Sequence, residues 1–108
     1  MFAPVETLED VNFYMPDKAS TNKIARFFSL FSDNSRVRLL SALAIAPLCV
    51  SDLSSILDMN QTTVSHQLKI LRDMDAVTYE RKGKVLYYRI ANSKINDILL
   101  IGVEYLGY

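Results

Sequence analysis

Apolar residues recur at helical spacing through most of the chain, which predicts a mainly α-helical fold. In the segment after Asn60, for example, Val64, Leu68 and Leu71 fall on one side of a helix and leave polar residues on the others. Residues suited to helix capping precede each apolar pattern. The predicted helices run from Ser20 or Thr21 to about Phe31, from Asp33 to Ala46, from Cys49 to Leu57, from Gln61 to Arg72, and from Asn92 or Ser93 to about Leu106.

Two runs of β-branched and aromatic residues lie between the last two helices and predict a hairpin. The strands cover Ala76–Arg81 and Val85–Ile90, joined through Lys82-Gly83-Lys84. Two helices joined by a short turn and followed by a basic hairpin are typical of a winged helix-turn-helix. The expected fold is therefore mainly α with one small hairpin, in the order α-α-α-α-β-β-α.

Residues 1–17 are separate in composition from residues 18–108, which form the expected DNA-binding and dimerisation domain. Leu8, Val11 and Tyr14 could line one face of a short helix that starts at Thr7. Proline on both sides limits the length of any such helix. Two interpretations stay open: a partly ordered arm, or an extra helix that packs across a dimer partner.

Formal net charge is zero, but the charges are unevenly distributed. Residues 1–17 hold four acids and no base, so residues 18–108 hold all 12 bases beside 12 − 4 = 8 acids, a net charge of +4. This bias permits phosphate binding. The one cysteine excludes an intrachain disulfide. We expect no leader, no membrane span and no catalytic constellation, and hence a cytoplasmic protein that is not an enzyme.

Four stretches carry a resemblance to a known family: DNSRVRLLSAL, LCVSDL, QTTVSHQLKIL and the hairpin RKGKVLYYRI. They resemble the ArsR/SmtB family of dimeric bacterial winged-helix repressors, over roughly residues 18–108. The resemblance implies a sequence-specific transcriptional repressor that binds an inverted-repeat operator on double-stranded DNA as a homodimer. The alternative is a winged helix that contacts proteins and has lost DNA binding.

The candidate DNA-binding residues lie on the fourth predicted helix and on the hairpin. An ordinary solvated helix face would carry more Glu and Lys, whereas this face offers mostly uncharged hydrogen-bonding groups, which suit base edges. The basic hairpin suits the DNA backbone or minor groove. The candidates are Gln61, Thr62, Thr63, Ser65, His66, Gln67, Lys69, Arg72, Arg81, Lys82 and Lys84.

The first long helix and the last one carry more apolar surface than one small domain can bury, which indicates a partner chain. In the family these two helices form the dimer interface. The candidate interface residues are Ile24, Phe27, Phe28, Phe31, Ile95, Ile98, Leu99 and Ile101.

The resemblance also locates two family metal sites, and neither is intact in this sequence. The Cys-x-Cys of one site is Cys49-Val50-Ser51 here, so one thiolate is missing. The positions aligned with the other site hold Asn92, Lys94, Tyr105 and Tyr108, which are poor ligands for a divalent metal. We therefore expect no metal and no other cofactor, with the inducer unknown. Cys49 is either a redox-responsive sensor thiol or a buried, inert cysteine.

Overall fold

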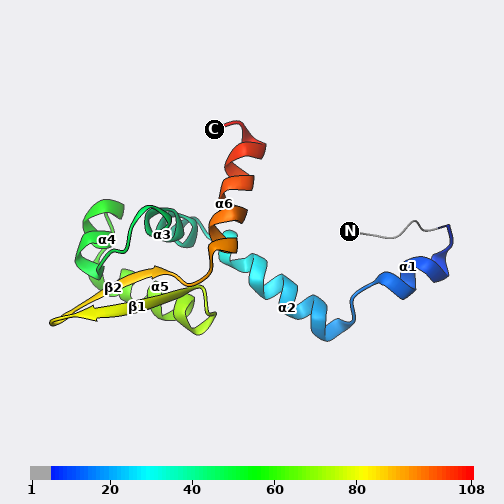
Figure 1. The fold of residues 1–108 in the computed structure, drawn as a ribbon, viewed down its shortest axis with the longest axis horizontal. Coiled ribbons are helices and arrows are strands. Elements are labelled where there is room, and N and C mark those ends of the chain that lie inside the picture. Colours follow the sequence, from blue (N-terminus) through cyan, green and yellow to red (C-terminus); the bar gives the residue numbers. More distant parts are fainter. Residues whose placement is uncertain (1–5) are drawn as a thin grey trace.

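The computed structural model describes residues 6–108, so the first five residues of the predicted N-terminal segment lie outside it. It shows a mainly helical chain with one antiparallel hairpin, which confirms the predicted winged helix-turn-helix (Figure 1). The elements are α1 (Leu8–Tyr14), α2 (Lys18–Phe28), a 3₁₀ turn (Ser29–Phe31), α3 (Asn34–Ile45), α4 (Val50–Leu57), α5 (Gln61–Asp73), β1 (Val77–Lys82), β2 (Val85–Ile90) and α6 (Ser93–Leu106).

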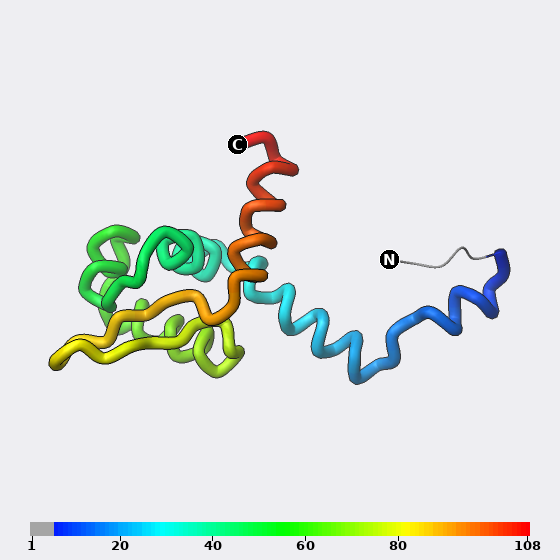
Figure 2. The backbone as a smooth tube through the Cα atoms, in the orientation of Figure 1, coloured from blue at the N-terminus to red at the C-terminus, as the bar shows by residue number. Residues whose placement is uncertain are grey.

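The helices are arranged as a packed body with two extensions (Figures 1 and 2). Helices α3, α4 and α5 and the hairpin form the body. Helix α2 runs away from the body and carries α1 at its far end, and α6 projects from the body in another direction. The molecule is accordingly elongated, with principal extents of 58 × 32 × 21 Å. The short helix predicted from Thr7 is present as α1, with Thr7 as its cap, and the packing of this helix across a partner stays a prediction.

The core of the body is made of leucines from α3, α4 and α5, together with Val64 and the start of β1. Leu39, Leu40, Leu53 and Leu68 are each 0% exposed. Complete burial of such a side chain contributes about 1.5–3 kcal/mol. These residues hold α4 and α5 in a fixed relation to each other.

Two apolar residues differ from their expected positions. Helical spacing in the sequence puts Leu53, Ile56 and Leu57 on one apolar face of their helix. In the structure Ile56 is 58% exposed, because α4 packs through Leu53 and Leu57. Ile95 was assigned to the dimer interface, but it is 4% exposed and lies in the core of its own chain. Its position in the first turn of α6, beside the body, leaves it no surface to offer a partner.

Carboxylate and amide caps define where the helices begin. Asp33 and Asn60 are helix caps as predicted, and of the two candidates for the last helix Asn92 rather than Ser93 is the cap. Helix α2 begins earlier than predicted, because Asp17 rather than Ser20 or Thr21 is its cap. The Asp17 Oδ1 accepts a 2.7 Å hydrogen bond from the Ser20 amide. This bond stabilises the carboxylate and holds the pKa of Asp17 below its ordinary value.

Three tight turns set the orientations of α5 and the hairpin. Asp58 and Asp75 follow α4 and α5 in the left-handed region, with φ of 52° and 59°. Aspartate tolerates this region better than most residues. The hairpin loop is the two-residue Gly83-Lys84, since Lys82 pairs with Val85 and β1 is shifted one residue later than predicted. Gly83 supplies the positive φ of 64° that a two-residue hairpin turn needs at its first position.

Candidate nucleic-acid interface

Helix α5 has one fully buried side and one side open to solvent. Val64, Leu68 and Leu71 are 0% exposed and fix the helix against the core. The residues that share the open side are polar and exposed: Gln61, Thr62, Thr63, Ser65 and His66. Because the apolar side cannot rotate outward, these five side chains must face whatever approaches α5.

The start of α5 is held by its cap and by the turn that precedes it. The Asn60 Oδ1 accepts a 2.7 Å hydrogen bond from the Thr63 amide. On the other side of the turn, the Ser54 hydroxyl donates to the carbonyl of Met59, which ties the turn back to α4. The N-terminal end of α5 is therefore rigidly positioned, and Gln61 is its first residue.

Gln67 differs from the other candidates on this helix, because its side chain is half-buried. The Gln67 Oε1 is screened from solvent and has no hydrogen-bond partner within residues 6–108. An unpaired buried acceptor is costly, typically about 1–3 kcal/mol. To read a base, Gln67 would have to turn its amide outward.

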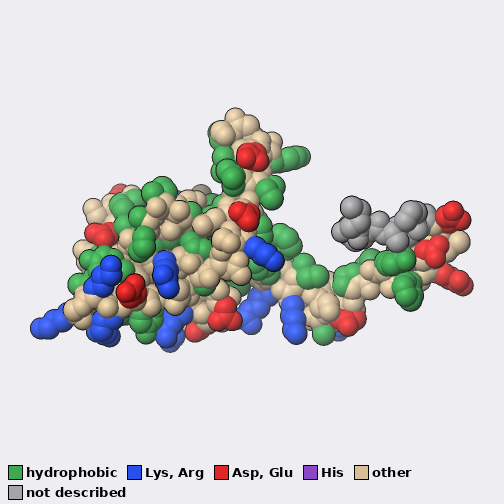
Figure 3. Space-filling model, viewed as in Figure 1, with side chains coloured by type: hydrophobic (Ala, Val, Ile, Leu, Met, Phe, Trp, Pro, Cys, Tyr) green, Lys and Arg blue, Asp and Glu red, His purple; other side chains and the backbone are tan. Residues whose placement is uncertain are grey.

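The hairpin extends from the body beside α5 and carries a cluster of cations. Arg81, Lys82 and Lys84 are all exposed around its tip. Lys and Arg side chains gather at this tip and along the lower edge of the molecule (Figure 3). The Lys82 Nζ lies 5.6 Å from the centre of the Tyr87 ring. The tip thus offers exposed positive charge that requires little geometric precision to meet a phosphate.

The far end of α5 carries the two other candidate cations. Lys69 and Arg72 are exposed. The Arg72 guanidinium lies over the Tyr79 ring of β1, with its carbon 4.4 Å from the ring centre. Arg72, near the C-terminal end of α5, therefore contacts the hairpin through a cation–π interaction.

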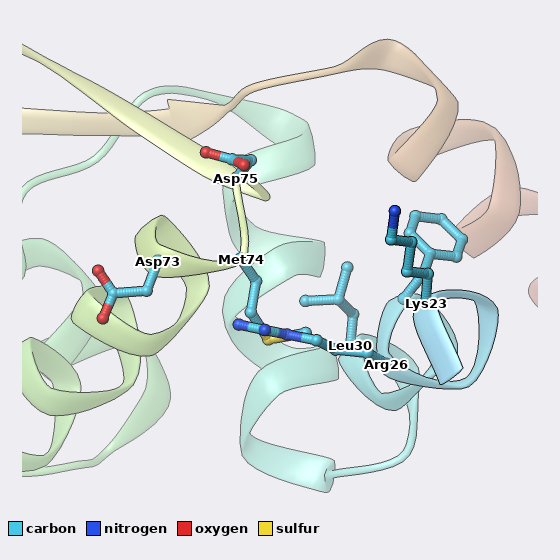
Figure 4. Close-up of a pocket in the computed structure, with 7 residues that line it drawn as sticks. Lys23, Arg26, Leu30, Asp73, Met74 and Asp75 are labelled. Atoms are coloured by element: carbon cyan, nitrogen blue, oxygen red, sulfur yellow. The ribbon is translucent and has the colours of Figure 1, made fainter. Parts of the chain in front are cut away.

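A groove that the sequence did not predict lies between α2 and the end of α5 (Figure 4). Its volume is about 380 Å³. Lys23 and Arg26 line it from α2, and Asp73 and Asp75 line it from α5 and the turn after it. The i, i+3 spacing of the two cations was visible in the sequence, but their position opposite these acids depends on how α2 meets the body.

The expected dimer surface is largely uncovered. Ile24 of α2, Phe28 of α2 and Ile101 of α6 are 48%, 54% and 62% exposed. The other candidates except Ile95 are half-buried, namely Phe27, Phe31, Ile98 and Leu99. Apolar exposure on this scale on α2 and α6 is typical of a protein–protein interface.

Cys49 is half-buried at the cap position of α4, where Asp52 accepts a 3.5 Å hydrogen bond from its amide. It lines a groove of about 400 Å³ that also contacts Ser65 of α5 and Lys84 of the hairpin. Within residues 6–108, no three His, Cys, Asp or Glu side chains gather where they could hold a metal ion. The same residues contain no helix long and apolar enough to cross a bilayer.

Comparison with known proteins gives consistent matches. Residues 33–79 match the model of bacterial regulatory proteins of the arsR family. A transcriptional repressor SmtB homolog from Synechocystis sp. is 40% identical over 98 residues, which cover 88% of this chain and 74% of the relative. The cadmium resistance regulatory protein CadC of Listeria innocua is 35% identical over 86 residues, which cover 79% of this chain and 72% of CadC.

Solved structures agree with these sequence relatives. The antimony-specific repressor AntR superposes with a TM-score of 0.75 at 28% identity, covering 94% of this chain and 95% of AntR. The homodimeric winged helix-turn-helix domain of Mb0332 from Mycobacterium bovis superposes with a TM-score of 0.73 at 26% identity. The superposition covers 86% of this chain and 92% of the Mb0332 domain. The resemblance inferred from the sequence is confirmed: the chain belongs to the arsR family of bacterial regulatory proteins and is a DNA-binding transcriptional regulator, not an enzyme.

Proposed function

We propose that this protein is a homodimeric repressor that reads an inverted-repeat operator with α5 and holds the flanking backbone with its hairpin. One observation carries the proposal: α5 is locked by a buried leucine-rich side and turns a row of uncharged hydrogen-bonding side chains outward. Such side chains can match donor and acceptor patterns in the major groove. The exposed hairpin cations supply sequence-independent attraction to phosphates.

The proposed homodimer would be two-fold symmetric, like the inverted repeat that it binds. The apolar faces of α2 and α6 would pair with those of a second copy, and each copy would present one α5 helix to the DNA. Helix-turn-helix dimers place their reading helices about 34 Å apart, one turn of the duplex. The homodimeric state of the Mb0332 domain supports this arrangement. A repressor of this kind acts in the bacterial cytoplasm, and we propose that location.

Selection from a pool of random duplexes tests this function directly. Rounds of binding and recovery with the full chain should enrich an inverted repeat whose half-sites are separated by about 10 base pairs, centre to centre. Two identical half-sites are expected because each α5 reads one of them. Failure to enrich any sequence, with binding no tighter than to the starting pool, would favour the alternative of a winged helix that contacts proteins.

We infer that the family metal sites do not control this repressor. The aligned positions at one site hold Asn92, Lys94, Tyr105 and Tyr108, and a lysine cation repels a bound dication. Zinc, nickel and cobalt titrated into the complex with the selected duplex should therefore leave the DNA bound. A Cys49→Ser variant serves as the control, because it removes the one thiol. Stoichiometric metal binding that releases DNA from both proteins would contradict the inference.

A further inference from the structure

Three aromatic and cationic side chains form a stack between α5 and the hairpin. The Arg72 guanidinium carbon lies 4.4 Å from the centre of the Tyr79 ring. On its partner strand Tyr88 faces Tyr79, with ring centres 5.5 Å apart and planes inclined by 58°. Tyr88 is in turn fixed to the segment before α4, since it exchanges two backbone hydrogen bonds with Leu48, of 3.0 and 2.8 Å. The stack is therefore anchored in the body.

The geometry of the stack leaves the hydrogen-bonding groups of Arg72 free. A guanidinium that lies over an aromatic ring uses its face, while its N–H groups point outward from the edge. Within residues 6–108 the Arg72 guanidinium makes no hydrogen bond to another side chain or to the backbone, and Arg72 is exposed. Arg72 lies in the last turn of α5, the proposed reading helix, so a duplex that runs along the whole of α5 would reach it.

We propose that Tyr79 is a positioning residue for DNA binding: its ring holds the Arg72 guanidinium in place to meet a phosphate. This inference rests on the proposed function of α5. An unsupported arginine loses side-chain conformational entropy when a contact fixes it. The ring reduces this loss, because the guanidinium is already held in position before DNA arrives.

Lys82 provides an internal comparison. Its Nζ lies 5.6 Å from the centre of the Tyr87 ring, farther than the 4.4 Å of the Arg72 contact. Lysine also lacks the planar group that stacks on a ring. Tyr87 should therefore contribute less to DNA affinity than Tyr79, although each ring lies beside a cation, Lys82 of the hairpin for Tyr87 and Arg72 of α5 for Tyr79.

A double-mutant cycle separates positioning from general support of the fold. The proteins are the full chain, Tyr79→Leu, Arg72→Ala and the double variant, with Tyr79→Phe as the variant that keeps the ring. Each is measured by fluorescence anisotropy on one duplex of about 30 base pairs and arbitrary sequence at low salt, long enough for both half-sites. Thermal unfolding of each protein reports on folding independently.

Tyr79→Leu should weaken binding about two- to five-fold per subunit, or about four- to twenty-five-fold for a dimer. The same change in the Arg72→Ala background should have an effect of less than about two-fold, and Tyr79→Phe should bind like the parent protein. Arg72→Ala should also flatten the dependence of log affinity on log salt by about one unit per subunit. Tyr87→Leu should have a smaller effect than Tyr79→Leu.

Equal losses from Tyr79→Leu in both backgrounds would overturn the inference, because they would show a structural role or a direct contact for Tyr79. An Arg72→Ala variant with unchanged affinity and salt dependence would overturn it too. In both cases the parent protein still binds DNA, and the proposed function survives. A parent protein that binds no duplex would instead overturn the proposed function itself.

Discussion

Phe28→Glu should convert the proposed dimer to a monomer and reduce affinity for the selected duplex by about 10²- to 10⁴-fold. Phe28 is 54% exposed on α2, beside Ile24, within the apolar face that we assign to the partner chain. A carboxylate buried there would face apolar groups without a partner, which is strongly unfavourable. The loss of affinity follows because a dimer binds its second half-site as an intramolecular event, and a monomer does not.

Ile45→Glu is the matched control, since it places the same charge on an exposed apolar residue of α3. Ile45 is 87% exposed and lies outside the proposed interface, so this variant should remain dimeric and bind DNA. Sedimentation at low micromolar concentration measures the state of each protein, and thermal unfolding verifies that both fold. A dimeric Phe28→Glu protein would remove α2 from the interface. A parent protein that is a stable folded monomer would contradict two-fold recognition altogether.

Gln61→Ala should weaken binding to the selected duplex by about 1–3 kcal/mol per half-site and barely affect binding to random DNA. Gln61 is the first residue of α5, exposed, and positioned by the Asn60 cap. Its amide can form a paired contact with one base edge, and alanine cannot. Anisotropy measurements on the two duplexes at one salt concentration give the difference. Gln67→Ala should have the smaller effect, because Gln67 is half-buried.

Replacing the hairpin lysines should have a different effect from Gln61→Ala, because it should not distinguish the selected duplex from random DNA. Lys82→Gln with Lys84→Gln removes charge that can meet any phosphate, so binding to both duplexes should weaken alike. The slope of log affinity against log salt should flatten by about two units per subunit. If Gln61→Ala instead weakened both duplexes equally, Gln61 would not read sequence. An unchanged salt slope in the lysine variant would remove the hairpin from the backbone contacts.

The amino-acid sequence by itself determined the order and type of the elements from α3 to α6. Helical spacing placed Val64, Leu68 and Leu71 on one side of α5, and all three are fully buried. The caps Asn60 and Asn92 were also predictable, because a cap acts on amides within three residues of itself. The row of polar residues on the outer side of α5 follows from the same periodicity.

Only the tertiary structure decided which apolar and polar residues remain accessible. Ile56 and Ile95 are both isoleucines in apolar helical patterns, yet the first side chain is 58% exposed and the second is 4% exposed. The difference arises because only Ile95 lies where another element covers it. Gln67 is half-buried, whereas its polar neighbours Ser65 and His66 on the same helix are exposed. Arg72 of α5 stacks on Tyr79 of β1. A side-chain contact between two elements depends on the angle at which those elements pack. The periodicity of residues along one element does not specify that angle.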